Sequence, residues 1–182
     1  GELHLEIIVD RLRREFKVEV NEGQPQVNYK EALTTGVEHT ERLKKQSGGS
    51  GLFAQMSFEL GPADEEFLKS DEFTSGKTKL QFVNDIFGGS VPKEYFASII
   101  KGFTSMMSNG VLAGYNIDSM KVRLFDGQTH SVDSKPLAFE LCAKEGFKEA
   151  AKLCNPVLME PIMKLEVTTP DEYVGAVIGD LN

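Results

Sequence analysis

The three histidines of this chain are the side chains best suited to acid–base chemistry at neutral pH. His130 lies in a polar stretch beside Ser131 and Asp133, where an imidazole could act as a general base. No serine or cysteine with a recognisable oxyanion motif accompanies it, and a single histidine in a loop is usually only exposed. We therefore assign no catalytic residue. A small-molecule enzyme that uses His130 and the glycine loop near residue 48 is kept as an alternative.

Side chains that bind metals do not cluster along the chain. His4, His39 and His130 are far apart and show none of the short spacings of metal sites, so we assign no metal. Cys142 and Cys154 are separated by a stretch with helical periodicity and lack the close pairing of zinc ligands. We expect both to be buried, reduced thiols, because disulfides are rare inside cells.

Two glycine-containing segments are similar to phosphate-binding loops. Gly76-Lys77-Thr78 has the tail of such a motif, but Asp71 stands where the motif needs glycine, and a strand follows where it needs a helix. This excludes nucleotide hydrolysis within the chain. The segment 47–51, Ser-Gly-Gly-Ser-Gly, could hold an anion with its N–H groups, but it precedes a strand and is typical of a flexible hairpin turn.

The bulk composition indicates a globular protein without a membrane partner. The 182 residues are 40% apolar, which is enough to bury one sizeable core or two small ones. No run of about 18 apolar residues occurs, and the first residues do not resemble a signal peptide. We therefore expect a cytoplasmic protein.

The charges are unevenly distributed. A net charge of −8 excludes a protein that coats nucleic acid through its average field. Basic residues nevertheless precede the glycine loop, and acidic residues fill the stretch 64–72. Both groups could be ordinary solvated surface, or they could form an acidic body with one basic end that approaches a polyanion end-on.

The hydrophobic periodicity predicts an α+β fold. Alternation predicts strands at 27–29, 52–60, 80–82, 120–124 and 157–168, with a turn at Asp126-Gly127 after the fourth. Helical spacing predicts helices at 5–16, from Pro92 to about 109, from a Ser134 cap to 154, and after a capping box at Thr169. The third of these helices should face inward through Leu137, Ala138, Leu141, Cys142, Ala150 and Leu153. This order of elements indicates a two-layer split βαβ sandwich.

The two ends of the chain lack the usual helix boundaries. The first helix begins within a few residues of Gly1 without a cap, and the last runs to Asn182 without a terminator. We therefore expect the chain to be a piece of a larger protein, cut through domains at both ends.

Five ordered blocks resemble elongation factor G, a family of translational GTPases. The blocks are Gly1–Asp10, Gln81–Tyr95, Asp126–Ser134, Glu160–Pro170 and Val177–Leu181. The resemblance covers nearly the whole chain and implies three parts: residues 1–22 end domain III, residues 23–156 form domain IV, and residues 157–182 begin domain V.

The resemblance also implies a function and a site. Domain IV of this family imitates the anticodon arm of a tRNA and enters the decoding region of the small ribosomal subunit during tRNA and mRNA translocation. Its distal end consists of two loops, here Gln46–Leu52 and Gly127–Asp133. The implied RNA-contacting residues are Gln46, Ser47, Gly48, Gly49, Ser50, Gly51, Gln128, Thr129, His130 and Ser131, with Arg42, Lys44 and Lys45 as supporting basic residues.

The implied partners are small-subunit rRNA, tRNA and mRNA. The piece itself should be monomeric and non-catalytic and should need no cofactor, because GTP and Mg²⁺ belong to a G domain that this sequence does not contain. The chain departs from the family where Ser50 replaces an arginine and Thr129 replaces a common aromatic residue. A specialised paralogue for ribosome recycling or atypical translocation is therefore an alternative, and a plain protein-interaction domain with an exposed apolar patch is another.

Overall fold

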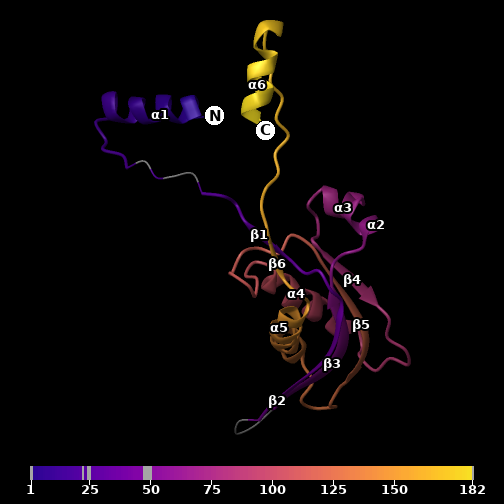
Figure 1. Cartoon of the computed structure of the whole chain (residues 1–182). Helices are drawn as coiled ribbons and strands as arrows, with labels where there is room; N and C mark the ends of the chain where they lie inside the picture. Colours follow the sequence, from indigo (N-terminus) through magenta and orange to yellow (C-terminus); the bar gives the residue numbers. More distant parts are fainter. Residues whose placement is uncertain (1, 22, 24–25, 47–50, 182) are drawn as a thin grey trace.

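The computed structural model describes residues 2–21, 23, 26–46 and 51–181, which form two sheets with helices packed on the larger one (Figure 1). The strands are β1 (Lys30–Ala32), β2 (Val37–Lys45), β3 (Leu52–Gly61), β4 (Leu80–Asn84), β5 (Met120–Gln128) and β6 (Val157–Met159). The helices are α1 (Glu2–Arg14), α2 (Glu65–Leu68), α3 (Asp71–Thr74), α4 (Phe96–Met106), α5 (Pro136–Leu153) and α6 (Val174–Leu181), with 3-10 turns η1 (Lys93–Tyr95) and η2 (Asp171–Tyr173).

The larger sheet has the strand order β2-β3-β5-β4. Only the β4–β5 pair among these strands is parallel, and α4 makes the crossover between its two members. The helices α4 and α5 pack on each other on one face of this sheet, as Figure 1 shows. The predicted α+β class and two-layer split βαβ architecture are confirmed.

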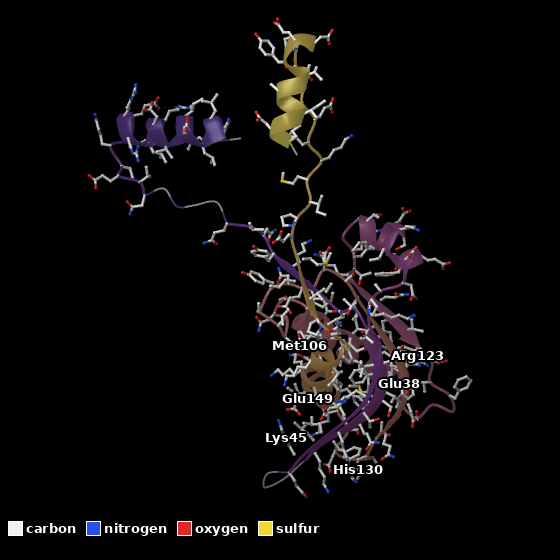
Figure 2. All side chains as sticks on the ribbon, in the orientation of Figure 1. Glu38, Lys45, Met106, Arg123, His130 and Glu149 are labelled. Carbon is white, nitrogen blue, oxygen red and sulfur yellow. The ribbon has the colours of Figure 1, made fainter. Side chains whose placement is uncertain are left out.

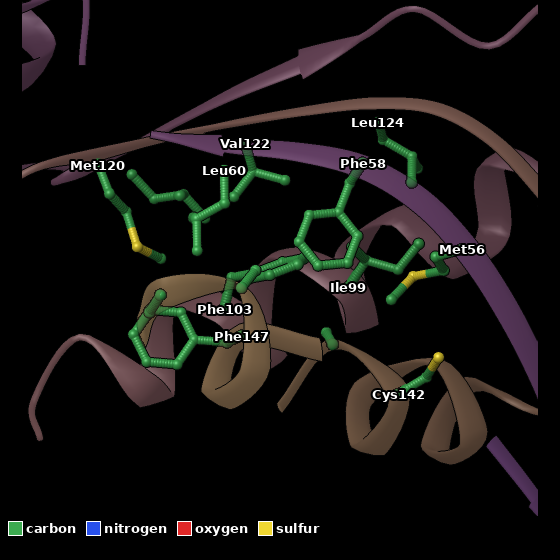
Figure 3. Packing of buried hydrophobic residues seen from close by; sticks show 14 of the residues in the cluster. Met56, Phe58, Leu60, Ile99, Phe103, Met120, Val122, Leu124, Cys142 and Phe147 are labelled. Atoms are coloured by element: carbon green, nitrogen blue, oxygen red, sulfur yellow. The ribbon is translucent and has the colours of Figure 1, made fainter. Parts of the chain in front are cut away.

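The core lies between the sheet and these two helices. Met56 and Phe58 of β3, Val122 of β5 and Phe103 of α4 are fully buried there, and Phe58 meets Phe103 edge-on with 5.0 Å between ring centroids (Figure 3). Burying one such side chain stabilises the fold by about 1.5–3 kcal/mol. The alternating apolar residues of the strand predicted at 52–60 therefore hold the sheet to its helices.

The predicted inward face of α5 is partly wrong. Ala138, Cys142 and Ala150 are buried as expected, but Leu137 and Leu153 are 54% and 64% exposed. The buried stripe instead includes Phe139 and Phe147, the largest apolar side chains on this helix. Because these two rings must be buried, the helix is rotated relative to the expected orientation.

The first and last predicted strands also differ from the structure. The first strand is Lys30–Ala32 rather than 27–29, and the last comprises only Val157–Met159 of the predicted 157–168. These two segments pair with each other in antiparallel register, from Lys30 opposite Met159 to Ala32 opposite Val157. A strand needs a partner for its backbone groups, so β6 ends at Met159, opposite Lys30, where β1 begins.

Both cysteines are buried and free, as predicted. Burial raises the pKa of Cys142 to about 12 and that of Cys154 to about 11. None of the helices in the described part of the chain combines the length and apolar character needed to cross a bilayer.

Glu31 on β1 is a fully buried carboxylate. Its side-chain oxygens accept hydrogen bonds from the backbone N–H groups of Leu112, Ala113 and Tyr115 at 2.8–3.0 Å. Burial raises the pKa of Glu31, but these backbone donors outweigh it and the net pKa is lowered. The carboxylate thereby joins the small β1–β6 sheet to the loop between α4 and β5.

Replacing Glu31 by glutamine should lower the free energy of unfolding by about 2–4 kcal/mol at neutral pH, because an amide cannot accept all of these N–H bonds. Since the folded-state pKa is lowered, the stabilisation is full above the ordinary value near 4.5 and is lost as the pH falls through the folded-state value. Urea titrations should therefore show the two proteins converging at acid pH. The exposed Glu149→Gln change is the control, and a pH-independent Glu31 effect would contradict the assignment.

Gly102 permits the close crossing of α4 and α5. A Cβ atom at this position would lie 2.7 Å from both the Ala143 Cβ and the Glu140 backbone oxygen. Gly102→Ala should therefore destabilise the chain by about 1–3 kcal/mol. Gly179→Ala on α6, where nothing lies within 4 Å of the added atom, should not. Thermal unfolding compares the two, and equal stabilities would contradict this packing.

Candidate nucleic-acid interface

The two predicted tip loops meet at one end of the large sheet. β3 pairs with β2 up to Lys45 opposite Leu52, and with β5 up to Gln55 opposite Gln128. The β2–β3 connection and the loop after β5 therefore lie at the same end of the sheet. Gln46, Gly51 and His130 line one cleft there, and Figure 2 places Lys45 and His130 at this end. The candidate residues Ser47, Gly48, Gly49 and Ser50 lie outside the described residues.

The loop that follows β5 is attached to β3 by two adjacent residues, Asp133 and Ser134. Asp133 accepts a hydrogen bond from the Gly51 N–H through its carboxylate at 3.0 Å and one from the Phe53 N–H through its backbone oxygen at 2.9 Å. Ser134 donates its hydroxyl to the Phe53 oxygen at 2.8 Å and accepts the His130 N–H at 2.8 Å. Tyr95, stacked on Phe139, donates to the Ser134 oxygen at 3.3 Å.

These bonds fix the position of the His130 ring. Its Nδ1 accepts the N–H groups of Val132 and Asp133 at 3.3 Å each, whereas the Asp133 carboxylate is 3.6 Å away, too far for a hydrogen bond. An Nδ1 that accepts leaves the hydrogen of the neutral ring on Nε2. The side chain is 54% exposed, so the ring can donate to an external acceptor.

The cleft beside His130 is basic and contains an aromatic ring. It has a volume of about 260 Å³ and is lined by Arg42, Lys44, Lys45, Gln46, Gly51, Leu52, Phe53, His130 and Asp133. The Arg42 guanidinium carbon lies 5.5 Å from the Phe53 ring centroid, and the His130 ring lies 6.2 Å from it. Asp133 is the one acid among these lining residues, and its carboxylate already accepts the Gly51 N–H.

The acidic stretch lies at the opposite end of the sheet. β3 runs from the cleft to Gly61, and α2 and α3 follow beyond that end (Figure 1). Asp64 there pairs with Lys121 at 2.8 Å, and this bond and one from Gln81 lower its pKa. Glu65, Glu66, Asp71 and Glu72 are exposed. The charge therefore changes from basic to acidic along the sheet.

This arrangement does not support nucleophilic catalysis. The Ser134 hydroxyl is used by the Phe53 oxygen, and Nδ1 of His130 is used by backbone N–H groups, so neither activates the other. The cleft is smaller than the roughly 300–1,000 Å³ of typical small-molecule sites. In the part of the chain that the structure describes, no group of three His, Cys, Asp or Glu side chains could hold a metal ion. The site is suited to binding through its cations, ring and donors.

Two predictions about the second loop are wrong. The turn expected at Asp126-Gly127 is absent, because β5 continues to Gln128, and a bulge at Phe125 turns Gly127 to the buried side. A Cβ on Gly127 would clash with Val91 and lie 2.5 Å from the Gln55 oxygen, so this glycine serves close packing rather than a turn. Ser134 does not cap α5, since its hydroxyl is bound to β3. Thr129 and Ser131 are exposed in the loop.

The residues that hold the loop were not recognised from the sequence. Asp133 and Ser134 act across more than eighty positions, and local spacing does not reveal such contacts. Phe53 could have been identified from the sequence, because it is an aromatic residue at an outward position of an alternating strand, directly beside the glycine loop.

Asp133→Ala should loosen the tip without unfolding the core. The Gly51 N–H would lose its acceptor, so its amide hydrogen exchange should accelerate about tenfold, equivalent to about 1.4 kcal/mol. Exchange at the Phe58 amide in mid-strand should stay unchanged. The exposed Asp126→Ala change serves as the control, and equal exchange at Gly51 in both variants would show that the carboxylate does not hold the loop.

Comparisons with known proteins agree on one family. The family model described as Elongation factor G, domain IV, matches residues 25–155. Elongation factor G of Amoebophilus asiaticus is 58% identical, and that of Cytophaga hutchinsonii 57% identical, over all 182 residues, which are 24% of each relative. The structure is similar to the crystal structure of a protein from Thermus thermophilus, with a TM-score of 0.82 and 35% identity over 100% of this chain and 25% of that one.

The chain spans about a quarter of the length of these relatives. The family model nevertheless matches well over half of the chain itself. The chain therefore belongs to the elongation factor G family, and residues 25–155 match that family's domain IV.

Proposed function

We propose that this chain is the ribosome-binding part of a translation elongation factor and that its tip enters the small-subunit decoding region to promote tRNA and mRNA translocation. The observation that carries the proposal is the meeting of two loops in one basic, histidine-bearing end of the large sheet. Family membership supplies the context of protein synthesis.

The chemistry of the tip suits RNA. Proteins recognise RNA through its shape, phosphates, 2′-hydroxyls and unstacked bases, which call for hydrogen-bond donors and cations on a protruding element. Gln46, Gln128 and His130 are exposed donors, and Arg42 and Lys44 add positive charge. The remaining tip candidates, Ser47, Gly48, Gly49, Ser50, Thr129 and Ser131, add small side chains that permit close approach.

The charge gradient along the sheet favours one orientation. The basic cleft is attracted to a polyanion, while the acidic residues around α2 and α3 are repelled by it. The chain should therefore approach RNA with the His130 end first. This attraction is local, because the net charge of the chain is −8.

Hydrolysis of GTP belongs, in this proposal, to a G domain elsewhere in a longer cytoplasmic protein, and this piece binds no cofactor. The helices α1 and α6 carry exposed apolar side chains, including Leu5 and Ile178 at 62% and 55% exposure. We assign these faces to packing against the rest of domains III and V, with residues 1–22 and 157–182 as the flanking parts.

A specialised paralogue is the second candidate, because Ser50 and Thr129 replace an arginine and an aromatic residue that the family usually has at the tip. A recycling factor would separate ribosomal subunits without moving mRNA. Measuring both reactions with the same full-length protein distinguishes the two functions.

His130→Ala in the full-length parent should slow mRNA movement about two- to tenfold, because one hydrogen-bond donor to RNA is lost. Replacing Gly48 and Gly49 by alanine should also slow it. The measurement is stopped-flow mRNA movement on pre-translocation ribosomes, with exposed Lys77→Ala, far from the cleft, as the control. Wild-type speed in both tip variants would remove the tip from the mechanism.

A further inference from the structure

The cleft at the tip combines planar groups with cations on one side of the His130 loop. We propose that it binds one unpaired RNA nucleotide, with the base against Phe53, Arg42 and His130 and the phosphate toward Lys44 and Lys45. This inference rests on the proposed function and adds the kind of RNA element that the tip holds.

Three planar groups from three separate segments come together in the cleft. The Phe53 ring of β3 contacts the Arg42 guanidinium of β2 at 5.5 Å and the His130 ring of the following loop at 6.2 Å. Proteins that bind unpaired bases stack them on aromatic rings, imidazoles and guanidinium planes. A base that enters this cleft therefore meets three surfaces of the right type.

Hydrogen bonds hold the Phe53 backbone and the His130 ring before any ligand binds. The Phe53 backbone is bound on both sides to Asp133 and Ser134, and the His130 ring is fixed through Nδ1. Arg42 lies in the middle of the β2–β3 ladder, opposite Gln55. Phe53 and His130 therefore have little order to gain on binding, which lowers the entropic cost.

The cations beside the planar groups suit a phosphate. Lys44 and Lys45 line the same cleft, and Lys45 pairs with Glu145 at 3.1 Å. Both members of that pair are largely exposed, at 59% and 42%, so the pair is worth about 0–1 kcal/mol and a phosphate can replace Glu145.

A second arginine–phenylalanine pair lies on the same face of the sheet and can be compared with Arg42 and Phe53. The Arg123 guanidinium lies 5.2 Å from the Phe125 ring centroid, much as Arg42 lies near Phe53. Arg123, however, forms ion pairs with Glu38, Glu59 and Asp85, which would repel a phosphate. Within the described residues no ion pair engages Arg42. Of the two arginine–phenylalanine pairs, the one between Arg42 and Phe53 is therefore the one that can accept an anionic ligand.

The size and lining of the cleft favour a nucleotide over a protein partner. Its volume of about 260 Å³ admits one small planar group, and among the described lining residues only Leu52 and Phe53 are large and apolar. A peptide-binding groove would need several apolar anchors.

The experiment is an NMR titration of the 182-residue chain at low salt with two RNA-like hexamers. One is hexaadenylate and the other has the same ribose-phosphate backbone without bases. The wild-type chain should bind hexaadenylate at least about fivefold more tightly, with the largest shifts at Phe53 and His130, because stacking one base contributes about 1–3 kcal/mol.

Phe53→Leu should abolish this preference, whereas Phe53→Tyr should keep it because the ring remains. Phe125→Leu, the matched control, should also keep it. Equal wild-type affinities for the two hexamers, or equal losses in Phe53→Leu and Phe125→Leu, would overturn the proposal. Amide spectra that match the wild type show that each variant is folded.

The hexamer titration tests the nucleotide site separately from the translocation assay, which tests the proposed function. A base preference that depends on Phe53 supports the nucleotide site even if the full-length parent fails to move mRNA. Translocation that depends on His130, combined with no base preference, would retain the proposed function and overturn the nucleotide site.

Discussion

The position of β3 between two antiparallel partners is the constraint on which the rest of this structure depends. The strand is paired along nearly its whole length with β2 on one side and β5 on the other. Its residues cannot shift against either neighbour by one position without exposing Met56, Phe58 and Leu60, which are buried under α4 and α5. The register therefore determines which loops meet at the end of the sheet.

The two faces of β3 have different roles. The inward side chains make the core, while the outward ones, Phe53 next to the tip and Glu59 further along, belong to the exposed surface of the sheet. The backbone of Phe53 also holds the His130 loop, so the same residue supports the site and lines it. A stable core and a fixed binding surface thus come from one strand.

Much of this could be predicted because it is local. Alternation located β3, β4 and β5, and helical spacing located α1, α4, α5 and α6. The strand at 30–32 could not be predicted, since it has three residues and a buried glutamate in its middle, and it forms only through its partner near residue 158. The resemblance to a family located the tip loops, but Asp133, Ser134 and Tyr95 hold them through contacts between distant parts of the sequence.

The Glu31 anchor has a mechanical consequence. It fixes β1 to the body directly beside β6, so both chain segments that lead toward α1 and α6 leave at the end remote from His130 (Figure 1). The body beyond this point is a tightly packed unit with low compressibility. If this body turned as one unit about the β1–β6 pair, the His130 end would move furthest, because it lies at the end remote from that pair.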